Sequence, residues 1–142
     1  MVLHNCDRNA ILAEPLKSHK DYELLQALKA LYRYVIDLGI HPQLYILYNA
    51  FSADMKISIQ MAGAQHQLVP PALHHALISE QSIRTFKQHF IDGLSICDPK
   101  FLSHLWGHLI QQAVLTLNLL FPARLNPRLS TKSLLNRAFG FN

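Results

Sequence analysis

Apolar residues recur every three to four positions between residues 24 and 38, which is the spacing of one face of an α-helix. These positions are Leu24, Leu28, Leu31, Val35 and Leu38. Ser18 or Asp21 precedes the run as a candidate N-cap, and Gly39 follows it as a candidate C-cap. The pattern therefore predicts a long amphipathic helix that ends at Gly39.

Shorter patterns predict the remaining elements. Compact apolar runs predict strands at residues 1–5, 10–14, 45–47 and 65–69, with a turn at residues 6–9. Helical patterns predict further helices at residues 52–61, 79–93, 102–120 and 130–138. We expect Ser52 to cap the first of these, and the helix from Ser79 to carry Ile83, Phe86 and Phe90 on its apolar face.

The order of these elements predicts the fold class. Strands that alternate with helices favour an α/β layer fold with a mixed sheet. In such folds the ligand site lies at the carboxyl ends of the strands, where Tyr48 and Asn49 follow the strand at 45–47. We expect one domain over residues 1–142, with residues 122–142 forming a basic C-terminal loop and short helix.

The composition of the chain restricts the classes of partner and cellular location that we expect. The chain has 142 residues, half of them hydrophobic, and a net charge of +4 with a pI near 9.2, which permits a nucleic-acid partner. Cys6 and Cys97 are far apart, so no disulfide framework is expected. No signal peptide is evident, and polar residues interrupt the apolar run 105–121. We expect a nuclear or cytoplasmic protein with no membrane partner.

Seven segments, taken in order, carry a family resemblance. They are RNAILAEPLK (8–17), DLGIHPQLYILYNAFSADMK (37–56), QLVPP (67–71), EQSIRTFKQHFIDGL (80–94), DPKFLSHLW (98–106), LTLNLLFPARLNPRLS (115–130) and FGFN (139–142). In this order and with these spacings the chain resembles the integrase catalytic core of LTR retrotransposons, in the copia-like group. The resemblance implies an RNase H-like mixed sheet flanked by helices, with the first strand missing from this chain.

The resemblance also implies what the catalytic site retains. The family holds two divalent ions, Mg²⁺ or Mn²⁺, on three carboxylates. Glu80 matches the third carboxylate and would be the metal ligand, although Gln81 stands where the family has arginine. Tyr48 occupies the place of the second carboxylate, and the first is absent together with its strand. We therefore expect a truncated, degenerate and catalytically inactive remnant that needs no cofactor as it stands.

The remaining candidates concern nucleic acid. The resemblance and the basic charge imply weak, non-specific DNA contacts. The candidate residues are His74, His75, Arg84, Lys87, Arg124 and Arg128. A solvated helix face with a Glu80–Arg84 ion pair is an equally open interpretation of the same helix. His104 and His108 have a spacing that suits a metal, but an ordinary polar face explains it better.

Two alternative functions remain open. The first is a non-catalytic interaction module, in which the fold is kept for a homodimer or for binding another integrase chain. If the first strand is lost, an exposed sheet edge would favour such association. The second is a weak metal-dependent nuclease that uses Glu80 together with Asp54 and Asp7.

Overall fold

The computed structural model describes residues 1–47, 52–69, 75–98, 100–101 and 103–137. Within these residues the fold is mixed α/β, with four strands and five α-helices, so the predicted class is confirmed. The elements are β1 (Val2–Asn5), β2 (Ala10–Ala13), α1 (Asp21–Asp37), β3 (Leu44–Leu47), α2 (Ala53–Met61), β4 (Gln65–Leu68), α3 (His75–Ser95), a 3₁₀ turn η1 (Ser103–Leu105), α4 (Trp106–Leu120) and α5 (Thr131–Arg137).

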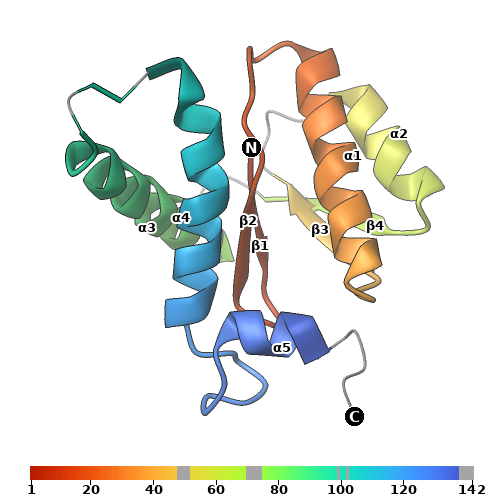
Figure 1. The fold of residues 1–142 in the computed structure, drawn as a ribbon. Helices are drawn as coiled ribbons and strands as arrows, with labels where there is room; N and C mark the ends of the chain where they lie inside the picture. The colour runs from red at the N-terminus through yellow and green to blue at the C-terminus, as the bar shows by residue number, and fades with distance from the viewer. Residues whose placement is uncertain (48–51, 70–74, 99, 102, 138–142) are drawn as a thin grey trace.

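The hairpin of β1 and β2 lies at the centre of the molecule (Figure 1). Its turn is closed by Asn9 at φ 59, a left-handed conformation that asparagine tolerates, and by a hydrogen bond from the Arg8 amide to the Asn5 side chain at 2.9 Å. Side chains alternate between the two faces. Ala10 and Leu12 pack towards α1 and α5, whereas Ile11 and Ala13 pack towards α3 and α4.

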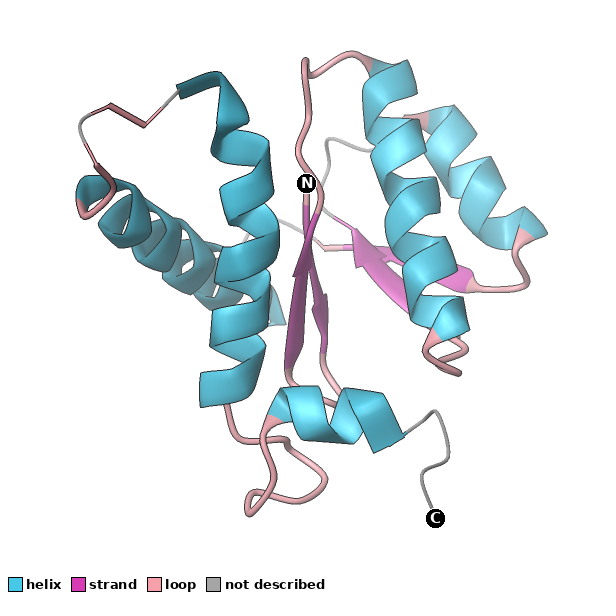
Figure 2. Cartoon of the chain, in the orientation of Figure 1, coloured by secondary structure: helices cyan, strands magenta, loops and turns pink. Residues whose placement is uncertain are grey.

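The second sheet pairs β3 with β4 in parallel, in the register Leu44↔Gln65 to Leu47↔Leu68. Tyr45 and Leu47 are buried in a cluster with residues of α1 and α2, and Figure 2 shows both helices beside this sheet. The predicted single mixed sheet is therefore only partly observed. Among the described strands, antiparallel and parallel pairing both occur, but in two separate two-stranded sheets.

The ends of the helices correct several predictions in detail. Helix α1 begins after Lys20, which makes no side-chain cap, so neither Ser18 nor Asp21 serves as the expected N-cap. Ser52 does stand at the N-cap of α2, but without a capping hydrogen bond. Helix α3 begins at His75, four residues before Ser79, so His75 is helical rather than part of a loop.

The predicted stop of α1 is confirmed. Gly39 adopts φ 68, and its amide donates to the Ile36 carbonyl at 2.8 Å while the Ile40 amide donates to Val35 at 3.1 Å. The same paired bonds close α2 around Gly63, at φ 78. Glycine reaches this left-handed conformation without strain, which explains why both helices stop where they do.

The long C-terminal helix and the segment after it complete the core. Residues 103–105 form the 3₁₀ turn η1, so α4 starts at Trp106, later than predicted. After α4, Pro122 and Ser130 form an antiparallel bridge, and Ser130 caps α5 through a bond from the Ser133 amide at 3.1 Å. The buried Leu135 then packs beneath the hairpin, so the basic C-terminal section also supplies core.

Candidate nucleic-acid interface

Helix α3 carries the main candidate residues, and aromatic packing fixes its rotation. Phe86 is buried against the hairpin and stacks on Phe90 with ring centroids 6.1 Å apart. Phe90 in turn meets Trp106 of α4 edge to face at 6.4 Å. Because these rings hold one face of α3 inward, residues on the opposite face point to solvent.

Glu80, Arg84 and Lys87 form an outward face of α3 to one side of the ring-bearing face, and all three side chains are exposed. Their spacing of four and three residues places them one above another along the helix. Since α3 starts at His75, Glu80 stands in the second turn rather than the first. Within the described residues, Glu80 makes no ion pair with Arg84, so the intrahelical pair of the alternative interpretation does not form in this structure.

The other predicted site residues are spread over the fold. Tyr48, Asn49 and His74 lie outside the described residues, and His75 is described only as the first residue of α3. Arg124 and Arg128 are exposed in the loop between α4 and α5. Figure 1 places this loop at the lower end of the hairpin, apart from α3. The basic candidates therefore form two separate groups.

The carboxylates do not assemble into a metal centre. Asp7 lies in the turn between β1 and β2, Asp54 in the first turn of α2, and Glu80 on α3. Among the described residues, no three histidine, cysteine or acidic side chains are grouped so that they could hold a metal ion. A two-metal centre needs bridging carboxylates a few ångströms apart. The described residues therefore do not fit the two metal ions that the intact family binds. We derive no catalytic step through those ions.

His104 and His108 lie at the start of the last long helical segment. His104 lies in η1 and His108 in α4, and both side chains are exposed. Neither belongs to a group that could hold a metal, as judged over the described chain. Their exposure agrees with the polar face that the sequence favours, and that interpretation stays a prediction.

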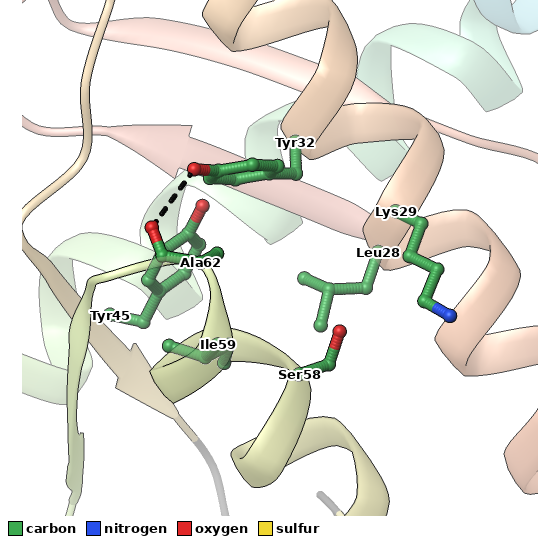
Figure 3. Close-up of a pocket in the computed structure, with 7 residues that line it drawn as sticks. All are labelled: Leu28, Lys29, Tyr32, Tyr45, Ser58, Ile59 and Ala62. Carbon is green, nitrogen blue, oxygen red and sulfur yellow. Dashed lines mark hydrogen bonds between the residues drawn. The ribbon is translucent and has the colours of Figure 1, made fainter.

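Two cavities were not anticipated from the sequence. One, of about 40 Å³, lies between α1, α2 and β3, where the Tyr32 hydroxyl donates to the Ala62 carbonyl at 3.2 Å (Figure 3). Burial, with a smaller contribution from Tyr32, raises the pKa of Tyr45 to about 12, so its phenol stays neutral. The other, of about 250 Å³, lies between α1, α4 and the end of β2 and is lined by Glu14, Tyr34 and Gln111 among apolar side chains.

Comparison of the chain with models of known protein families, and with curated protein sequences, finds no match. The functional argument therefore rests on the residues themselves. Across the described part of the chain, every helix is too short or too polar to cross a lipid bilayer.

His4 lies in β1 within the electrostatic reach of Arg124, and it makes the stability of the fold depend on pH. Burial lowers the pKa of His4 below 6.5, Arg124 adds to this, and a hydrogen bond to the Asn9 side chain at 3.2 Å opposes it. The unfolded chain therefore binds the proton more tightly. The contribution of His4 to stability is full above about pH 6.5 and is lost as the pH falls through the lowered pKa.

We expect urea unfolding to show lower stability near pH 5 than near pH 7.5, and His4→Gln to reduce that difference. The matched control is His41→Gln, because His41 is an exposed histidine outside the regular elements. An equal pH dependence in the wild type and the His4→Gln protein would contradict this role for His4.

Proposed function

We propose that this chain is an RNase H-like remnant of a retrotransposon integrase core, which binds nucleic acid weakly and without sequence preference and is catalytically inactive. In this proposal the chain belongs to the DNA-integration family as a pseudoenzyme derived from a transposable element. Its partner is DNA in the nucleus or cytoplasm. Mg²⁺ or Mn²⁺, which serve the intact family, have no role in this chain.

The observation that carries the proposal is the outward face of α3. Arg84 and Lys87 are exposed on a helix whose other face is anchored by Phe86 and Phe90. Two cations that lack ion-pair partners among the described residues are available to phosphate oxygens. The mixed α/β order, with a hairpin packed between α1 and the α3–α4 pair, supports the RNase H-like part of the proposal.

Charge reversal tests the binding surface. We expect the Arg84→Glu/Lys87→Glu double variant to bind a short fluorescent DNA duplex about tenfold more weakly than the wild type, as measured by fluorescence anisotropy. The dependence of log affinity on log salt should also become shallower by about two. Both effects follow because each lysine or arginine at a phosphate releases about one counterion on binding.

The control carries the same change of charge on another helix. Lys29 and Arg33 are exposed on α1, so Lys29→Glu/Arg33→Glu alters the net charge equally without touching α3. Equal losses in the two double variants would mean that only net charge matters, and the assignment of α3 as the DNA surface would be wrong. Cleavage of the duplex with added Mn²⁺, abolished by Glu80→Gln, would instead establish the nuclease alternative.

A further inference from the structure

The outer edge of β2, on the side away from β1, presents the backbone groups of two residues. Glu14 and Met1 exchange both of their backbone hydrogen bonds, with N···O distances of 2.6 and 2.9 Å. Antiparallel pairing alternates, so the backbone groups of Leu12 also point to β1. The amide and carbonyl groups of Ile11 and Ala13 therefore point to the outer edge.

Helix α4 closes this outer edge at Ile11. The Asn118 side chain donates to the Ile11 carbonyl at 2.7 Å and accepts from the Ile11 amide at 3.0 Å. A single side-chain amide can satisfy both backbone groups of an extended residue, because it holds a donor and an acceptor side by side. These two bonds also agree with the alternation, since Ile11 must point its backbone groups outward to meet α4.

Ala13 points its backbone groups the same way but has no such partner. Ala13 is 5% exposed, and within the described residues neither its amide nor its carbonyl takes part in a hydrogen bond. Buried backbone groups in folded proteins are paired, with rare exceptions, to protein, ordered water or a ligand. The unpaired groups of Ala13 therefore mark a position at which a bound molecule would be stabilised.

Ala13 lines the larger of the two cavities, which has a volume of about 250 Å³. Figure 1 shows α1 and α4 flanking the hairpin, and the cavity lies between these helices where β2 ends. Its apolar lining includes Leu12, Leu31 and Val114. An apolar cavity of about 150 Å³ is enough to hold benzene. This cavity therefore has room for a benzene-sized ring with a small polar group attached.

Three polar residues, Glu14, Tyr34 and Gln111, complete the lining of this cavity. Gln111 lies two helical turns before Asn118, so both amides project from the same side of α4. Tyr34 is 43% exposed and Gln111 is exposed, which places both at the solvent side of the cavity. Glu14 contributes a carboxylate, which disfavours a ligand of negative charge.

We propose that this cavity binds a small planar molecule that carries a primary carboxamide. The carboxamide N–H donates to the Ala13 carbonyl and its oxygen accepts from the Ala13 amide, as the Asn118 side chain does at Ile11. The ring of the ligand fills the apolar part of the cavity. A carboxylate of the same shape does not fit, because it has no donor for the Ala13 carbonyl and is repelled by Glu14. This inference goes beyond the proposed DNA binding and does not depend on it, because the cavity uses neither α3 nor the basic loop.

The probes are benzamide and benzoate, which share one ring and differ in the polar group. We expect benzamide to shift the NMR signal of the Ala13 amide saturably, with a dissociation constant on the order of 1 mM for a ligand of this size. At about ten times that concentration, hydrogen exchange of the Ala13 amide should slow by about tenfold. Benzoate should bind at least about tenfold more weakly, because it cannot donate to the Ala13 carbonyl.

A pair of alanine substitutions tests the cavity from the protein side. Ala30 lines the cavity from α1 and is exposed, so Ala30→Phe puts a ring into the space without replacing a core residue. Ala53→Phe is the matched control, because it makes the same change at an exposed alanine of α2. We expect the first to weaken benzamide binding by about tenfold or more and the second to leave it within about twofold. The comparison of benzamide with benzoate tests the site on the unaltered protein if Ala30→Phe does not fold.

Three outcomes would overturn the proposal. One is no change at the Ala13 amide with benzamide at about 10 mM, and another is equal binding of benzamide and benzoate. The third is protection of the Ala13 amide in the free protein that Gln111→Leu abolishes. That last result would mean that the Gln111 side chain itself occupies the site, as Asn118 does at Ile11.

Discussion

Replacing Asn118 with alanine should lower the free energy of unfolding by about 2–6 kcal/mol, as measured by urea denaturation. The Asn118 Nδ2 donates to the Ile11 carbonyl at 2.7 Å, and its Oδ1 accepts from the Ile11 amide at 3.0 Å. Asn118 is 2% exposed and Ile11 is fully buried. Alanine would leave two buried backbone groups without partners, each costing about 1–3 kcal/mol.

Two variants separate this effect from a general weakening of α4. Asn118→Asp keeps the acceptor but loses the donor and places a carboxylate oxygen against the Ile11 carbonyl, so it should destabilise as well. Gln112→Ala changes an exposed amide on the same helix and should shift stability by less than about 0.5 kcal/mol. Asn118→Ala could instead lower the free energy of unfolding as little as Gln112→Ala. In that case the two hydrogen bonds between Asn118 and the Ile11 backbone would not contribute to stability as described.

Asn118 also shows where sequence reasoning stops. In the sequence it is only a polar interruption of the apolar run 105–121. Its partner Ile11 is 107 residues away, so no local pattern connects the two. A side-chain amide resembles the backbone of a neighbouring strand, and α4 uses this resemblance to close β2. Such a pairing becomes visible only once helix and hairpin are placed together.

The sequence predicted those features that depend only on neighbouring residues in the chain. The spacing of Leu28, Leu31 and Val35 predicted α1, and all three are buried. Glycine predicted the end of that helix because its backbone reaches positive φ without strain. The starts were less predictable. Lys20 precedes α1 without a capping side chain, and α3 begins at His75, ahead of Ser79 where the sequence predicted its start.

At the candidate site, too, local spacing was predictable from the sequence, whereas the distances between separate elements were not. Helical spacing places Glu80, Arg84 and Lys87 to one side of the face that carries Phe86 and Phe90, and all three charged side chains are exposed. Whether Asp7 and Asp54 approach Glu80 depends on how the hairpin turn, α2 and α3 are arranged in space. The sequence could not settle that question, and the structure keeps the three acids apart.

A substitution in the C-terminal helix α5 should also cause a large loss of stability. We expect Leu135→Ala to lower the free energy of unfolding by about 2–5 kcal/mol, measured in urea. Leu135 is 1% exposed and packs with Ala10 and Leu12 of the hairpin and with residues of α1. Removing its branched side chain loses the burial energy and leaves a cavity that the neighbouring strand and helix can fill only in part.

The control is Leu125→Ala, the same substitution ten positions earlier in the same basic section. Leu125 is 69% exposed, so its loss should change stability by less than about 0.5 kcal/mol. A similar small effect at both positions would mean that α5 rests on the hairpin without stabilising it.

The contrast between the two leucines matters for any test of nucleic-acid binding. The loop that carries Arg124 and Arg128 is tied to the core at both ends. The Asn9 side chain donates to the Pro122 carbonyl at 3.2 Å, and the Thr131 hydroxyl donates to the Arg8 carbonyl at 3.2 Å. Deleting residues 122–142 would therefore remove core together with charge. Substituting Arg124 and Arg128 alone changes the charge of the surface while the contacts of Leu135 and Thr131 remain.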